Sequence, residues 1–244
     1  MNAADHYFSA ALAALDAARK TQTAQVQTAA RWIADAIAAD HLLFVTGSGH
    51  SHMLAEEVFY RAGGLAAVYP ILDPGLMLHD AALASTQLER VEGIATVRLE
   101  SAGVGPGDVL LIASNSGRNA FPVEAALEGK RRGAKIIALT SLQHSQSVTS
   151  RHSSGQRLFE IADLVLDTGV PAGDAAVELN GLDLPVGPLS TVAGAALMNA
   201  VMVQVVANLL ATGHTPPVFR SANVGSDFPA EDLAPWSARI PPLR

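Results

Sequence analysis

Cysteine is absent from the sequence, and charged residues are few. Without a thiol the chain cannot form disulfides, use a cysteine nucleophile or bind zinc through thiolates. Charged residues make up 16% of the 244 residues and apolar residues 49%, a balance that excludes an intrinsically disordered chain. The length is sufficient for a sizeable core, in one large domain or two small ones.

An excess of positive charge is also missing. Lys and Arg number 16 against 23 Asp and Glu, which gives a net charge of −7. This balance excludes a broad basic surface for nucleic acid or for anionic membranes. We therefore expect neither as a partner, and we expect any anionic ligand to be held locally by amides and hydroxyls.

The first twenty residues lack the features of a signal peptide. A signal peptide has a basic start and then an uninterrupted apolar stretch, but Asp5, His6 and Asp16 interrupt this segment. We therefore read it as a helix of a cytoplasmic protein.

Residues 184–214 contain no charged side chain, and residues 192–210 are almost wholly apolar. The length alone would suffice to cross a membrane. Asn199, Gln204 and Asn208 interrupt the segment, and neither end is flanked by Lys or Arg. We expect a helix that is buried in the core or in the interface of a homo-oligomer, either a dimer or a tetramer.

The remaining pattern alternates short apolar runs with amphipathic stretches. It predicts strands at residues 41–46, 66–72, 108–113, 135–140 and 163–167. It predicts helices at residues 53–61, 85–101 and 121–132, one or two helices within 2–39, a short helix or loop at 143–153, and a long irregular loop at 169–187. This alternation predicts an α/β fold, a three-layer αβα sandwich with a doubly wound, mainly parallel five-stranded sheet. We expect one domain over residues 1–244, with a helical extension at residues 1–40 and a tail at residues 212–244.

The run of residues 114–119, called the second loop below, lies between a predicted buried strand and a predicted helix. Free N–H groups at a helix start attract anions, and two serine hydroxyls and an asparagine amide add further donors. Gly117 allows the backbone to approach a ligand closely. Arg118 either pairs with the bound anion or points into solvent. The alternative to phosphate binding is a capped turn rich in Ser and Asn.

Residues 47–52, called the first loop below, follow the first predicted strand and are rich in glycine. They resemble a dinucleotide fingerprint, but His52 occupies the third glycine position. Asp73 would bind the ribose in that alternative. A dinucleotide site does not need the second loop, whereas a phosphosugar site uses both loops.

The two loops together resemble those of the sugar isomerase (SIS) domain family. The start of the apolar helix at Ser190 also resembles the last helix of the family, and the resemblance covers about residues 40–210. It is strongest to a bacterial subgroup designated UPF0309, which is related to phosphoheptose isomerases and N-acetylmuramic acid 6-phosphate etherases. The family patterns fall on Gly47, Gly49 and Ser51 in the first loop and on Ser114, Ser116, Gly117 and Asn119 in the second, where Asn119 replaces the usual hydroxyl.

The resemblance implies an SIS fold and a phosphosugar ligand. The residues that we expect to bind phosphate and sugar are Gly47, Ser48, Ser51, Ser114, Asn115, Ser116, Gly117, Asn119 and Ser190.

An aldose–ketose isomerase needs a base that moves a proton between adjacent carbons. Glu57 lies on the helix after the first loop, although the family isomerases place their glutamate about one turn further, where this chain has Arg61. Glu92 resembles the acid/base glutamate of the etherases. Either glutamate could instead be a solvated charge on a helix surface.

His50 and His52 are candidates to assist the opening of the sugar ring, because imidazole exchanges protons near neutral pH. A His-x-His pair can also bind zinc, but no third ligand has a diagnostic spacing. We expect no metal and no cofactor. The sequence favours a phosphosugar isomerase, with an etherase-like lyase acting on an amino sugar phosphate and a non-catalytic sugar-phosphate sensor as alternatives.

Overall fold

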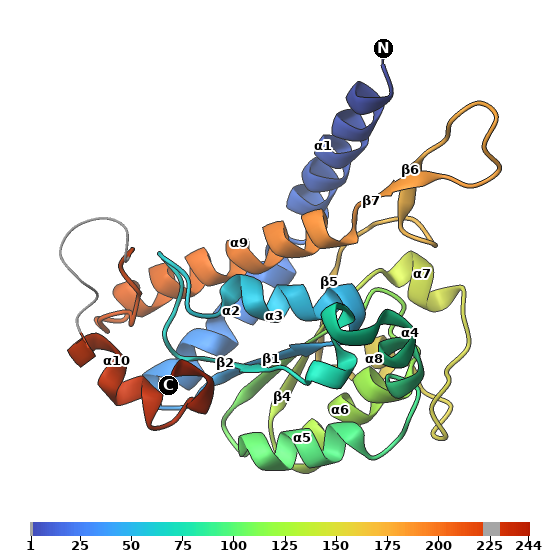
Figure 1. Cartoon of the computed structure of the whole chain (residues 1–244). Coiled ribbons are helices and arrows are strands. Elements are labelled where there is room, and N and C mark those ends of the chain that lie inside the picture. Colours follow the sequence, from blue (N-terminus) through green and yellow to red (C-terminus); the bar gives the residue numbers. More distant parts are fainter. Residues whose placement is uncertain (1, 222–229) are drawn as a thin grey trace.

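A five-stranded parallel sheet runs through the centre of the computed structural model (Figure 1), which describes residues 2–221 and 230–244. The strands lie in the order β2 (Val68–Ile71), β1 (Leu43–Gly47), β3 (Val109–Ala113), β4 (Lys135–Thr140) and β5 (Leu164–Asp167). Each neighbouring pair is parallel. The predicted doubly wound, five-stranded α/β sheet is therefore confirmed.

Helices cover both faces of the sheet, which makes three layers. Val109 and Leu111 of β3 pack on one face, and Leu110 and Ile112 pack on the other, because successive side chains of a strand point to opposite faces. The first face is covered by α2 (Thr23–Ala38), α3 (Met53–Val58) and α9 (Ser190–Ala211). The second face is covered by α5 (Ile94–Ala102), α6 (Ala120–Arg131) and α8 (Leu158–Ile161). Burial on both faces explains why β3 is apolar at every position.

The N-terminal segment forms two helices, α1 (Ala3–Thr21) and α2. Helix α1 projects away from the sheet (Figure 1), and Ala18 is its only buried residue. Phe8 and Leu12 are consequently 65% and 67% exposed. Two large apolar side chains one helical turn apart are thus left without cover on this chain.

Two predicted helices have different bounds in the structure. The helix expected at 85–101 is interrupted, with α4 (Leu78–Leu88) ending before Gly93 and α5 beginning after it. Gly93 has φ 99°, a left-handed conformation that breaks the helix. The helix expected at 53–61 ends at Val58, because Phe59 is extended and Tyr60 has φ 43°.

The sequence predicted a long irregular loop at residues 169–187, but part of this segment has regular structure. It contains an antiparallel hairpin of β6 (Ala175–Val177) and β7 (Val186–Pro188). The hydroxyl of Tyr7 in α1 donates a 3.0 Å hydrogen bond to the carbonyl oxygen of Pro188. The hairpin is therefore held against α1 by a contact between residues far apart in the sequence.

The remaining elements are short. They are the 3-10 helices η1 (Gly49–His52), η2 (Pro74–Leu76) and η3 (Pro241–Leu243), and the α-helices α7 (Leu142–Gln146) and α10 (Ala230–Ser237). Helix α7 is the helical part of the segment predicted as a helix or loop at 143–153.

Helix α9 is the charge-free helix predicted from the sequence. By length and composition alone it is the one helix, within the described ranges 2–221 and 230–244, that could cross a membrane. One of its faces, with Met198, Val201 and Val205, is buried against the core. On its outer face Val203 is 71% and Leu210 61% exposed. The helix is thus a core helix with an apolar outer face.

Candidate functional site

The first and second loops lie side by side because they follow adjacent parallel strands. Gly47 at the end of β1 is in register with Ala113 at the end of β3. The chain leaves both strands at the same edge of the sheet, where open α/β sheets bind ligands. A Cβ atom on Gly47 would lie 2.6 Å from the carbonyl oxygen of Ser51. Only glycine therefore fits where the first loop turns back on its strand.

A small cleft lies between the two loops and the beginning of α9. Its enclosed volume is about 20 Å³, which is room for about one water-sized group. The lining residues are His50, Ser51 and Leu54, Ser114 and Asn115, Leu139 and Thr168, and Ser190 and Thr191. The structure thus brings five of the predicted site residues, from three distant segments, to one cleft: His50, Ser51, Ser114, Asn115 and Ser190.

The other predicted binding residues lie in the loops but outside the cleft lining. Gly117 has φ 56°, and a Cβ atom there would lie 3.0 Å from Ser145 Oγ, so the second loop is packed tightly on the segment beneath it. The N–H of Gly117 donates a 3.2 Å hydrogen bond to Ser114 Oγ. Ser116 is half-buried, and Asn119 and Ser48 are buried.

A carboxylate that the sequence analysis missed, Glu89, connects the two loops. Ser48 Oγ in the first loop donates to Glu89 Oε2 at 2.8 Å, and Asn119 Nδ2 in the second donates to Glu89 Oε1 at 2.6 Å. Burial raises the pKa of Glu89, and the hydrogen bond from Ser48 and the charges of Arg90 and Arg151 oppose this shift. A half-buried carboxyl group with a raised pKa between the two loops is suited to proton transfer.

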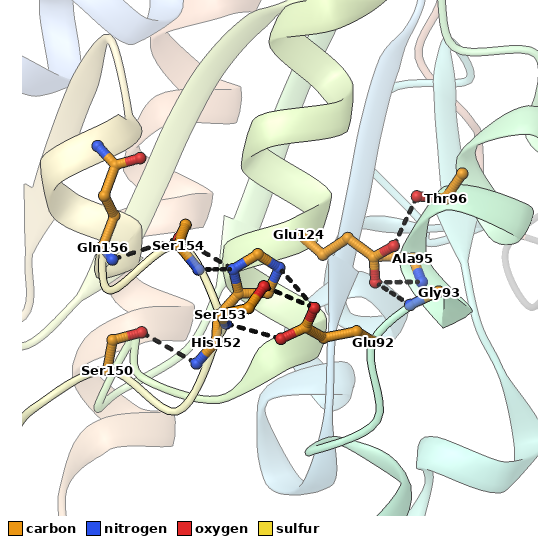
Figure 2. Close-up of polar contacts among 10 residues, drawn as sticks. All are labelled: Glu92, Gly93, Ala95, Thr96, Glu124, Ser150, His152, Ser153, Ser154 and Gln156. Atoms are coloured by element: carbon orange, nitrogen blue, oxygen red, sulfur yellow. Dashed lines mark hydrogen bonds and ion pairs between the residues drawn. The ribbon is translucent and has the colours of Figure 1, made fainter.

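Glu92, the predicted candidate three residues further along, makes different contacts (Figure 2). Its carboxylate accepts hydrogen bonds from the N–H of Ser153 at 2.7 Å and from Ser153 Oγ at 2.8 Å, and His152 Nε2 lies 3.8 Å away. The hydrogen bonds from Ser153 lower the pKa of Glu92, and the side chain is exposed. Glu92 therefore ties the segment after α7 to the beginning of α5, whereas Glu89 ties the two loops together. Neither carboxylate is among the residues that line the cleft.

Glu57 points to another part of the molecule. Its carboxylate accepts a 2.8 Å hydrogen bond from Asn199 Nδ2 in α9 and pairs with Arg61. These residues line a separate cavity that contains Met202 and Val206. The structure does not bring Glu57 to the cleft.

His52 is buried in η1, unlike His50. Its Nδ1 contacts the carbonyl oxygen of Gly49, and its Nε2 lies 3.7 Å from Glu56. Of the four predicted catalytic residues, His50 is thus the one in the cleft lining.

A buried glutamate, Glu124 of α6, fixes the start of α5 (Figure 2). Its carboxylate accepts hydrogen bonds from the N–H of Gly93 at 2.8 Å, the N–H of Ala95 at 3.3 Å and Thr96 Oγ1 at 2.5 Å. These bonds satisfy donors that a helix start leaves unpaired. Glu124 thereby holds the chain that carries Glu89 and Glu92 against α6.

The start of α9 at the cleft is capped by Asp174, which directly precedes β6. The Asp174 carboxylate accepts from the N–H of Ser190 at 2.7 Å and from Ser190 Oγ at 2.5 Å. The position of the hairpin therefore determines how Ser190 is presented to the cleft.

Metal ligands do not gather in the part of the chain that the structure describes. No group of three or more His, Asp or Glu side chains there lies close enough to hold a metal ion.

Comparison with known proteins identifies the family. The family model of the SIS domain matches residues 6–141. A UPF0309 protein of Halalkalibacterium halodurans is 46% identical over 215 residues, which are 88% of this chain and 89% of that protein. A UPF0309 protein of Brucella canis is 46% identical over 220 residues, 90% of this chain and 89% of that protein.

Solved structures share the fold. A phosphoheptose isomerase from Neisseria gonorrhoeae is similar, with a TM-score of 0.52 and 19% identity over 82% of this chain and 95% of that chain. A phosphoheptose isomerase from Francisella tularensis is also similar, with a TM-score of 0.54 and 15% identity over 84% of this chain and 98% of that chain. The Vibrio vulnificus NanR protein complexed with ManNAc-6P has a TM-score of 0.53 and 15% identity over 100% of this chain and 70% of that chain. The fold, the two loops and the extent of the sequence similarity all agree, and this chain belongs to the UPF0309 group of SIS domain proteins.

Proposed function

We propose that this protein is a cytoplasmic isomerase that interconverts the aldose and ketose forms of a sugar phosphate. The observation that carries the proposal is the position of Glu89, whose half-buried carboxylate accepts hydrogen bonds from both loops of the site. An isomerase needs an anion site and a base next to each other, and these two hydrogen bonds support such an arrangement.

The second loop is the proposed phosphate site. It leads into α6, a helix of 12 residues whose N-terminus attracts negative charge. Ser114 and Ser116 supply hydroxyl donors beside it, and Ser51 faces the same cleft from the first loop. The cleft is small, so the sugar itself would extend beyond it along the first loop.

Glu89 is the proposed base. Isomerisation moves a proton between C1 and C2, and the base works best when its pKa is close to the working pH. Burial raises the pKa of Glu89 in this direction. Glu57 and Glu92 are paired with Asn199 and Ser153 instead, and these contacts favour Glu89 over either.

His50 is the proposed group for ring opening. It lines the cleft together with Ser51, so its imidazole can exchange a proton with a sugar oxygen bound there. The phosphoheptose isomerases and the ManNAc-6P complex among the structural neighbours support a sugar phosphate as the ligand class.

The proposed enzyme is a homo-oligomer. Phe8 and Leu12 on α1 and Val203 and Leu210 on α9 are large apolar side chains that this chain leaves exposed. A second copy of the chain that packs on these helices would remove them from water.

A binding assay with a panel of sugar phosphates tests the proposal. A phosphorylated sugar should raise the melting temperature, and its unphosphorylated parent should not. Ser116→Ala should weaken the binding measured by calorimetry about tenfold, the loss of a hydrogen bond to a charged group. Ser101→Ala on the exposed surface of α5 is the matched control and should bind normally. NMR of the best ligand with enzyme present then detects isomerisation, and binding without turnover would identify a sensor.

A further inference from the structure

Three arginines gather around the second loop near Glu89, and none of them forms an ion pair with it. Arg118 belongs to the loop, Arg90 follows Glu89, and Arg151 lies in the segment after α7. None of the three takes part in the ion pairs formed among residues 2–221 and 230–244. Arginines elsewhere, such as Arg98 and Arg157, are paired with carboxylates. This cluster is therefore a local excess of positive charge on a protein of net charge −7.

Hydrogen bonds place the arginine cluster around Asn119. The main-chain N–H of Arg151 donates to the carbonyl oxygen of Arg118 at 2.7 Å, and Arg151 Nη1 donates to Asn119 Oδ1 at 2.9 Å. The amide nitrogen of the same Asn119 donates to Glu89, the neighbour of Arg90. Asn119 thus connects the segments that carry all three guanidinium groups.

The cluster has unused hydrogen-bonding capacity. Arg118 Nε is buried and has no hydrogen-bond partner within the described part of the chain, while its Nη2 makes only a long 3.4 Å contact with Thr149 Oγ1. Arg90 and Arg151 are exposed. A buried donor without a partner is unfavourable, so an anion that accepts hydrogen bonds here would be stabilised.

The charges of the cluster act on one another. Partial desolvation of its guanidinium lowers the pKa of Arg151, repulsion from Arg118 and Arg90 lowers it further, and attraction to Glu89 opposes the shift. The negative charge of Glu89 therefore offsets the positive charge of the arginine cluster only in part. Like charges held together in this way favour the binding of an anion.

The cluster is separate from the phosphate cleft. Ser114 and Asn115 of the second loop line the cleft, whereas the cleft lining includes neither Asn119 nor any of the three arginines. The second loop therefore presents one set of donors to the cleft and another set, at its end, to the arginine cluster. Two anionic groups on one ligand could be bound at the same time.

We propose that the arginine cluster binds a second anionic group of the substrate, so that the substrate is a sugar phosphate with a further carboxylate or phosphate. The inference rests on the proposed function and narrows its substrate class. Guanidinium groups bind both kinds of anion through paired hydrogen bonds, which explains the presence of arginine here where the cleft uses hydroxyls.

Calorimetric titration with three ligands tests this inference. Fructose 6-phosphate has one anionic group, fructose 1,6-bisphosphate adds a phosphate, and 6-phosphogluconate adds a carboxylate. We expect at least one of the doubly anionic ligands to bind about tenfold more tightly than fructose 6-phosphate, as one charge-assisted hydrogen bond provides. Tighter binding of 6-phosphogluconate would identify the second anionic group as a carboxylate, and tighter binding of fructose 1,6-bisphosphate would identify it as a phosphate.

Single variants connect the tighter binding to the cluster. Arg151→Gln and Arg90→Gln should each remove most of the tenfold difference and leave fructose 6-phosphate binding unchanged. Arg151→Gln removes a hydrogen bond to Asn119 and could disturb the second loop. Arg90 is exposed and forms no ion pair within the described residues, so Arg90→Gln tests the cluster independently. Arg31→Gln is the matched control, because Arg31 lies in another cavity beside Asp35.

The outcomes separate this inference from the proposed function. Equal binding of all three ligands, or an equal loss for all three in Arg90→Gln, would overturn the second anion site and leave the phosphate site standing. Failure of all three to bind would overturn both.

Discussion

Ser48 Oγ donates a 2.8 Å hydrogen bond to the carboxylate of Glu89, and this bond joins the first loop to the chain at the end of α4. Asn119 joins the second loop to the same carboxylate at 2.6 Å. Both loops therefore respond to the protonation state and the position of one side chain. The proposed phosphate site and the proposed base form a single unit.

Glu89→Gln should abolish most of the isomerase activity without unfolding the protein. The amide cannot accept a proton from the sugar, and loss of a general base lowers turnover by roughly 10²- to 10⁴-fold. Glu92→Gln is the control, because Glu92 contacts Ser153 outside the cleft, and its turnover should change little. NMR of substrate conversion by both variants gives the answer. The opposite order of effects would make Glu92 the base.

The pH dependence of activity should show the raised pKa of Glu89. A base with a raised pKa becomes protonated at a higher pH than an ordinary glutamate. We therefore expect kcat/KM to fall, as the pH is lowered, in a range above that of a free glutamate side chain. A profile with its acid limb at or below the range of free glutamate would contradict this assignment.

The raised pKa of Glu89 also makes the stability of the fold depend on pH. A raised pKa in the folded state means that Glu89 stabilises the fold when protonated, and this contribution is lost as the pH rises through the raised pKa. The stability of the wild type relative to Glu89→Gln should therefore decrease as the pH rises from the range in which a free glutamate ionises through the raised pKa of Glu89. Urea unfolding of both proteins at several pH values measures this. A relative stability that increases over the same range would show that the pKa is lowered instead.

Gly47→Ala should disrupt the first loop. The added Cβ would lie 2.6 Å from the carbonyl oxygen of Ser51 and 3.0 Å from that of Ala113, and both are backbone atoms. Overpacking of this kind destabilises a fold by about 1 to 3 kcal/mol. Gly105→Ala is the control, since its nearest atom lies 3.8 Å away. Thermal unfolding should separate the two variants, and equal melting temperatures would count against the described turn.

Glu124→Ala should destabilise the contact between α5 and α6. Glu124 accepts hydrogen bonds from two main-chain N–H groups and one hydroxyl (Figure 2), and its removal leaves the buried N–H of Ala95 and two partly buried donors without this partner. We expect a loss of about 2 kcal/mol or more. The exposed Glu100, with one 3.9 Å ion pair to Arg132, is the control, and Glu100→Ala should cost less than about 1 kcal/mol. Chemical denaturation of both variants measures the difference, and similar losses would argue against the capping role.

A double substitution, Phe8→Asp with Leu12→Asp, should dissociate the proposed oligomer. Charges at these exposed positions of α1 would oppose its burial against a second copy. Light scattering after size exclusion should give a multiple of the 25.3 kDa chain mass for the wild type and a smaller multiple for the variant. Leu83→Asp is the control, because Leu83 is 82% exposed on α4. A wild type that elutes as a monomer would refute the oligomer.

The strands and both loops were predictable from the sequence for a physical reason. A strand buried on both faces, such as β3, must be apolar at every position, and the polar loop that follows must lie at the carboxyl edge of the sheet. The pairing of Gly47 with Ala113 then brings the loops together. This reasoning placed His50, Ser51 and Ser114 at one edge of the sheet, and in the structure all three line the cleft.

The carboxylates were not predictable in the same way. The sequence suggested one helix over residues 85–101, and on a continuous helix Glu89 and Glu92 would lie on neighbouring positions of one face. Gly93 breaks that helix, so Glu89 faces the loops and Glu92 faces Ser153. The hairpin after Asp174 depends on Tyr7, 181 residues from its partner Pro188, and no local pattern encodes such a contact.

Calorimetric titration of a sugar phosphate into the wild type and into Ser116→Ala tests whether the second loop binds the phosphate group. The ligand is the compound that gives the largest shift in the thermal panel. We expect this ligand to bind the wild type, its unphosphorylated parent not to bind, and Ser116→Ala to bind the ligand about tenfold more weakly. Equal binding of the sugar and its phosphate, or equal affinity of the two proteins, would contradict a phosphate site in the second loop.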